Sequence, residues 1–66
     1  MKILRLKDVM HTTGLSRSTV YSYISEGTFP KSVQLGSRAV GWVESEVQDW
    51  LMERVKERDE LALVAR

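Results

Sequence analysis

The chain has no cysteine, one histidine and one proline among its 66 residues. The lack of cysteine excludes a disulfide framework and any zinc site built on thiolate ligands. The single histidine, His11, cannot form a metal cluster alone, and we expect it on the surface of a helix. No apolar run approaches the roughly 20 residues that a membrane-spanning helix needs, and no signal segment is evident. These absences predict a small cytosolic protein with no membrane contact, no metal and no cofactor.

The formal net charge of +1 hides an uneven distribution of charged residues. Residues 1–42 carry six cations and two acids, for a net charge of +4, whereas residues 43–66 carry four cations and seven acids, for a net charge of −3. A basic body followed by an acidic segment suits a protein that binds a polyanion through one end only.

Two short helices joined by a glycine-containing turn are predicted in the first half of the chain. The first helix runs from about Leu6 to Thr13 and ends at Gly14. The second follows Ser16, whose hydroxyl can cap its first turn, and ends before Gly27, which enters the left-handed conformation without a Cβ penalty. Two helices in this arrangement are typical of a helix-turn-helix. The residues expected to face the core from the second helix and its turn are Leu15, Val20, Tyr23 and Ile24.

A β-hairpin is predicted after the proline at position 30, which cannot continue a helix. Its strands are expected at residues 32–35 and 39–43, with the turn at residues 36–38. An isolated hairpin is only marginally stable, so apolar side chains of both strands should pack against the helices. These side chains are Val33, Leu35, Val40 and Trp42.

The last helix begins near Glu44, where early carboxylates favour the positive end of the helix dipole. Its apolar stripe predicts a core face made of Val47, Trp50, Leu51 and Val55. We expect one domain over residues 1–58, which makes the fold mainly α with a small β-hairpin, a winged helix-turn-helix. Residues 59–66 form a tail that is either an extension of the last helix or frayed. Trp42 and Trp50 are interpreted as core anchors.

The outward face of the helix over residues 16–26 is rich in hydroxyls, with a cation at its start and no acid before Glu26. Arginine can bond a phosphate or guanine, and serine or threonine can serve base edges or backbone. At the hairpin, cations can track the backbone or enter the minor groove. The alternatives are a solvated helix face, a solvated turn, and a Thr19 methyl that packs beneath the turn. The predicted DNA-binding residues are Ser16, Arg17, Ser18, Thr19, Tyr21 and Ser22 on the helix and Lys31, Gly36, Ser37 and Arg38 on the wing.

Catalysis is not expected. Serines, a histidine and acids are present, but no nucleophile–base spacing and no phosphate-binding glycine loop stands out. The competing hypothesis to DNA binding is a protein-interaction adaptor that places the basic face on an acidic partner.

Five segments, taken in order, closely resemble the AlpA family of small regulators of prophages and integrative islands. They are LRLKDV (4–9), TGLSRSTVY (13–21), GTFPK (27–31), LGSRAVGW (35–42) and SEVQDWL (45–51). The family is related to winged-helix excisionases and to the DNA-binding part of MerR proteins, so the resemblance implies a MerR-like winged helix-turn-helix. Ser22 departs from the pattern, because a basic residue is often expected there.

The resemblance also implies a function. The helix over residues 16–26 would enter the major groove of double-stranded DNA with the turn at residues 36–38 beside it. The protein would control excision of a mobile element, either as a recombination directionality factor or as a transcriptional activator of the integrase gene. Cooperative binding to repeated sites or self-association is expected, because one small domain makes too few contacts for high specificity. An integrase is a further possible partner.

Overall fold

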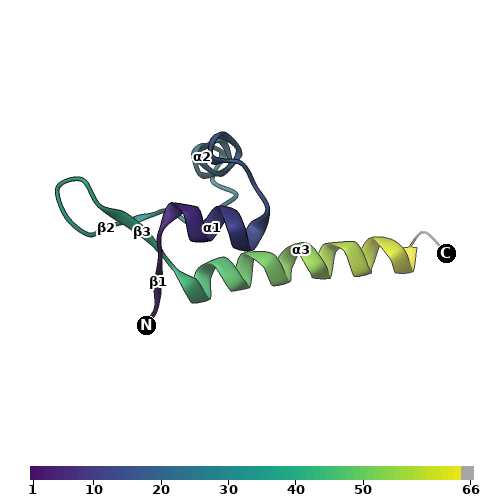
Figure 1. Ribbon diagram of the computed structural model, residues 1–66. Helices are drawn as coiled ribbons and strands as arrows, with labels where there is room; N and C mark the ends of the chain where they lie inside the picture. The colour runs from purple at the N-terminus through teal and green to yellow at the C-terminus, as the bar shows by residue number, and fades with distance from the viewer. Residues whose placement is uncertain (65–66) are drawn as a thin grey trace.

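The computed structural model describes residues 1–64, and over this range the chain forms three helices and a small three-stranded antiparallel sheet (Figure 1). This arrangement confirms the predicted winged helix-turn-helix. The elements are β1 (Ile3–Leu4), α1 (Leu6–Thr13), α2 (Arg17–Glu26), β2 (Val33–Gln34), β3 (Val40–Val43) and α3 (Glu44–Val64).

Local capping sets the ends of α1 and α2, and three of these caps, at Gly14, Ser16 and Gly27, were predicted. Gly14 and Gly27 both adopt left-handed backbone conformations, with φ of 75° and 78°. The amide of Gly14 donates to the carbonyl of Met10 at 2.8 Å, which satisfies one of the last free carbonyls of α1. At the other end of α1, the Asp8 carboxylate accepts a hydrogen bond from the backbone amide of Arg5 at 3.2 Å. Because a carboxylate in the first turn also suits the positive end of the helix dipole, Asp8 stabilises the start of α1 in two ways.

The sheet has the strand order β1-β3-β2, so the predicted hairpin gains a third strand. Strand β1 pairs with β3 through Ile3 opposite Val43 and Leu4 opposite Trp42. Two residues are too few for an alternating pattern to identify a strand in the sequence. The two hairpin strands are also shorter than expected. The loop that joins them is closed by a hydrogen bond from the Leu35 amide to the Ala39 carbonyl, at 2.8 Å.

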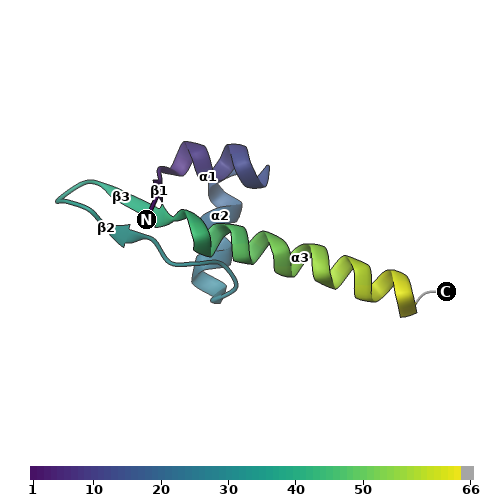
Figure 2. The ribbon, with the colours of Figure 1, turned by 90° about the horizontal axis from the view of Figure 1, so that it is seen from below.

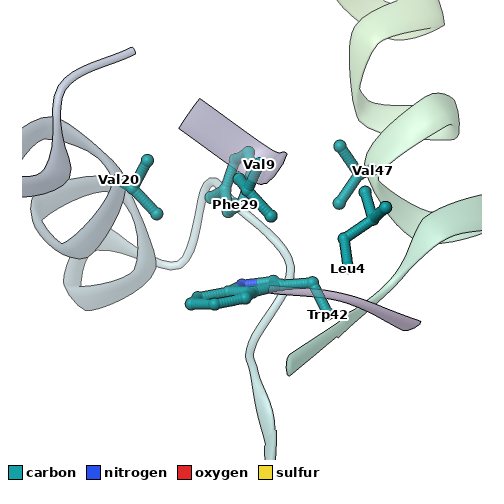
Figure 3. Close-up of a cluster of buried hydrophobic side chains, with 6 residues drawn as sticks. All are labelled: Leu4, Val9, Val20, Phe29, Trp42 and Val47. Atoms are coloured by element: carbon teal, nitrogen blue, oxygen red, sulfur yellow. The ribbon is translucent and has the colours of Figure 1, made fainter. Parts of the chain in front are cut away.

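Six side chains form the buried core among the described residues (Figure 3). Strands β1 and β3, the three helices and the loop after α2 each contribute one of them, so the core holds all these segments together. The six are Leu4, Val9, Val20, Phe29, Trp42 and Val47. Trp42 is fully buried, as predicted for a core anchor.

The expectation that the apolar side chains at and beside β2 pack against the helices is wrong. Val33 and Leu35 are 41% and 47% exposed. Val33 pairs with Gly41, which places its side chain on the sheet face opposite that of Trp42. The Leu35 side chain lies 3.0 Å from where a Cβ on Gly41 would be, so it also covers the outer face of the sheet.

Helix α3 starts directly after β3 and runs well past the rest of the molecule (Figures 1 and 2). Val47 is buried and Trp50 and Leu51 pack against the core, but Val55 is 39% exposed. The prediction that Val55 closes the core is therefore wrong, because α3 has left the body of the domain by that point. Helix α3 includes residues 59–64 of the predicted tail, and residues 65–66 lie outside the described part. Within residues 1–64 no helix is both long and apolar enough to cross a lipid bilayer.

Candidate nucleic-acid interface

Helix α2 packs one side against the core and presents the other to solvent. Val20 is fully buried, and Leu15, Tyr23 and Ile24 pack against the core cluster. This orientation follows from the apolar spacing of the sequence. The predicted helix residues consequently lie on the exposed side, with one exception in Thr19, which is half-buried. Those exposed are Ser16, Arg17, Ser18, Tyr21 and Ser22.

The hydroxyls at the start of α2 bond to one another. Ser16 Oγ accepts a hydrogen bond from the backbone amide of Thr19 at 3.2 Å and donates one to Thr19 Oγ1 at 2.8 Å. Ser18 Oγ lies 3.3 Å from Ser16 Oγ. The Ser16 and Thr19 hydroxyls thus serve the helix cap, whereas Ser18 and Ser22 line a shallow hollow on the outer surface of α2 together with Thr19 and Tyr23.

A chain of ring contacts connects Arg17 to the core. The guanidinium carbon of Arg17 lies 6.0 Å from the centroid of the Tyr21 ring. The Tyr21 ring in turn meets Trp42 edge-on, with centroids 6.3 Å apart and an angle of 65° between planes. The i, i+4 spacing of Arg17 and Tyr21 is visible in the sequence, but the contact with Trp42 is not. Tyr21 therefore helps to position a cation that could otherwise sample many rotamers.

Two indole groups hold the loop between α2 and β2. Trp42 Nε1 donates to the Pro30 carbonyl at 3.0 Å, and Trp50 Nε1 donates to the Thr28 carbonyl at 2.6 Å. Phe29, between these two carbonyls, packs edge-on against Trp50 with centroids 4.9 Å apart. This loop leads from α2 to Lys31, so the two tryptophans fix where the wing starts relative to α2.

The wing residues are all exposed. Gly36, Ser37 and Arg38 lie in the loop between β2 and β3, which extends away from α2 at one end of the molecule (Figures 1 and 2), whereas Lys31 precedes β2. The amides of Leu35 and Gly36 both donate to the Ala39 carbonyl, at 2.8 and 3.2 Å, and close the base of the loop. Ser37 and Arg38 consequently sit at its tip. The structure therefore presents the two predicted sets as two separate surfaces, linked through the Tyr21–Trp42 contact.

The cations of α2 and the wing are available for a ligand. Over residues 1–64 the ion pairs are Lys2–Glu44 at 3.6 Å, Arg54–Glu57 at 2.7 Å and Arg58–Asp59 at 2.9 Å. Arg17, Lys31 and Arg38 take part in none of these pairs. In the same range, no cluster of three His, Asp or Glu residues could hold a metal ion. The arrangement suits contact with an extended polyanion through charge and hydroxyl groups.

Comparisons with known proteins agree with the resemblance noted in the sequence. A family model described as prophage CP4-57 regulatory protein (AlpA) matches residues 2–55. The chain is 40% identical over 62 residues to the DNA-binding transcriptional activator AlpA of Escherichia coli K12, a match that covers 85% of this chain and 89% of that protein. It is 47% identical over 57 residues to the uncharacterized protein ORF88 of enterobacteria phage P4, covering 86% of this chain and 65% of that protein. The chain thus spans just under two thirds of the phage protein.

Proposed function

Because the chain belongs to the AlpA family of prophage regulatory proteins, we propose that it is a double-stranded DNA-binding regulator that controls excision of a prophage or integrative element. It acts either as a recombination directionality factor or as a transcriptional activator of the integrase gene, and an integrase is a further candidate partner. The observation that carries the proposal is the outer face of α2. There a positioned arginine and short hydroxyl side chains project from a helix that is anchored to the core.

In the proposed complex, α2 lies in the major groove and the wing loop lies beside it. Arg17, in the first turn of α2, forks onto guanine or fixes the helix against a phosphate. Ser18 and Ser22 are short enough to let the helix approach base edges closely. The Tyr21 hydroxyl can donate a hydrogen bond to a phosphate oxygen. Arg38, at the loop tip, meets the backbone or a narrow minor groove.

A monomer of this size buries too little DNA surface for high specificity by itself. We therefore propose cooperative binding of several copies to repeated sites.

A salt titration with a duplex from an attachment site or integrase promoter tests the proposal. If three to five cations of the body meet phosphates, log K should fall with log salt at a slope of roughly −3 to −4.5. A slope near zero would refute DNA binding. Tight binding to an acidic protein with no affinity for duplexes would support the adaptor hypothesis instead.

Two arginine variants then separate the helix from the wing. Arg17→Ala should weaken specific binding by about 1–3 kcal/mol and, if the contact is to a base, relax preference at one position. Arg38→Ala should weaken specific and scrambled duplexes alike and reduce the salt slope by about 1. Arg58→Ala removes the same charge from α3 and serves as the matched control, with little effect expected. If Arg38→Ala alone alters sequence preference, the wing reads the site and the docking is reversed.

A further inference from the structure

The outer part of α3 carries an exposed stripe of apolar and charged side chains that the DNA-binding role does not use. The stripe consists of Met52, Val55, Lys56, Asp59, Glu60 and Leu63, which with Glu53 line one shallow groove along the helix. Met52 and Leu63 are 63% and 72% exposed. We call these six residues the α3 stripe.

Nothing else in the described part of the chain covers the α3 stripe. Figures 1 and 2 show this part of α3 extending beyond α1, α2 and the sheet. The residues recur at intervals of three and four, so they share one side of the helix. Apolar side chains that lie together on one exposed side of a projecting helix are a feature of interaction surfaces.

The order of residues along the α3 stripe makes it complementary to a reversed copy of itself. If a second α3 runs antiparallel about a point midway between residues 57 and 58, Met52 faces the Leu63 position of the other copy. In the same register Lys56 faces Asp59, and Val55 faces the aliphatic stem of Glu60. Both ends of the contact are then apolar, and opposite charges meet on each side of its centre.

A parallel arrangement lacks this complementarity. It would place Lys56 beside Lys56 and Asp59 beside Asp59, and like charges brought together disfavour association. Lys56 takes part in no ion pair within residues 1–64, and the Arg58–Asp59 pair is between well-exposed side chains, so both Lys56 and Asp59 can engage a partner. The charges thus suit a second copy of the chain and favour the antiparallel over the parallel direction.

We propose that two copies of this chain associate through antiparallel pairing of their α3 stripes. Residues 52–63 span only about 18 Å of helix, so the contact is small and the pairing is weak and reversible in solution. Two copies held on neighbouring DNA sites would pair far more readily, because binding there raises their effective concentration. This consequence rests on the proposed function, whereas the pairing itself does not.

Sedimentation of the full chain without DNA, at concentrations up to about 1 mM, tests the pairing. Lys56→Glu and Asp59→Lys should each weaken dimerisation by roughly five- to tenfold, because each turns two attractions into repulsions. The double variant that exchanges the two charges should restore wild-type association. Lys7→Glu on α1 is the matched control and should leave association unchanged. Circular dichroism confirms that each variant keeps its helices.

Disulfide trapping tests the direction of the pairing, and the absence of native cysteine makes single-cysteine variants unambiguous. Met52→Cys and Leu63→Cys are mixed and oxidised, and the products are identified by intact mass. If the two variants are mixed in equal amounts, random pairing would make about half of the disulfide-linked dimers mixed, and the mixed disulfide should exceed that fraction. Excess of either homodimer would overturn the antiparallel arrangement, and a wild-type chain that stays monomeric at the highest concentration would overturn the pairing. Because no DNA is present, neither result depends on the proposed regulatory function.

Discussion

Trp50 should contribute a large share of the stability of this domain. Its indole packs against Phe29 at 4.9 Å and Tyr23 at 6.3 Å between centroids, and its N–H bonds to the Thr28 carbonyl at 2.6 Å. Removing such a side chain in Trp50→Ala should cost about 3–5 kcal/mol. A 66-residue domain has a free energy of unfolding of roughly 3–10 kcal/mol in total. The Trp50→Ala variant should therefore be either largely unfolded or only marginally stable.

Trp50→Phe divides that cost between the ring and the hydrogen bond. Phenylalanine keeps an aromatic face toward Phe29 but loses the N–H donor and part of the ring volume. A hydrogen bond contributes about 0.5–1.5 kcal/mol, and the Thr28 carbonyl is partly open to water, so a loss of about 1–2 kcal/mol is expected.

Thermal and urea unfolding followed by circular dichroism measure both variants. In a domain of this size each ~1 kcal/mol lowers Tm by about 4–8 °C. A Trp50→Ala variant that melts cooperatively at the wild-type temperature would refute the stabilising role of Trp50 packing against the core. If Trp50→Phe costs as much as Trp50→Ala, the hydrogen bond to the loop outweighs ring packing and the division above is wrong.

Three further changes test the fold. Gly41→Ala should destabilise by about 1–3 kcal/mol in urea unfolding, because a Cβ there would overlap the Ile3 side chain and lie 3.1 Å from the Leu4 carbonyl oxygen. Gly36→Ala is the control and should be nearly neutral, because a Cβ there would make an ordinary contact with the Ala39 Cβ at 4.0 Å. Ser16→Ala should cost about 1 kcal/mol by the same assay through loss of the α2 cap, whereas Ser25→Ala should cost less. Deleting residues 61–66 should leave cooperative unfolding intact while weakening self-association in sedimentation; loss of folding would instead place the tail in the core.

The sequence by itself determined α1 and α2 and where each of them ends. A serine cap, two glycines that accept positive φ and the apolar spacing between them act within a few residues, so their effect does not depend on the rest of the fold. The same local periodicity settled which side of α2 faces outward. The exposed helix residues of the candidate site could therefore be predicted, with Thr19 as the half-buried exception. Their contact with DNA stays a prediction.

Only the tertiary structure decided the features that join segments distant in the chain. Strand β1 exists because Ile3 and Leu4 find partners on β3, about forty residues later. The Trp50–Thr28 bond, the Tyr21–Trp42 contact and the exposure of Val33 have the same origin. The sequence shows whether a side chain is apolar or can donate a hydrogen bond. Which surface or carbonyl that side chain meets depends on how the elements pack. For the same reason the sequence did not reveal that α3 leaves the body after Leu51.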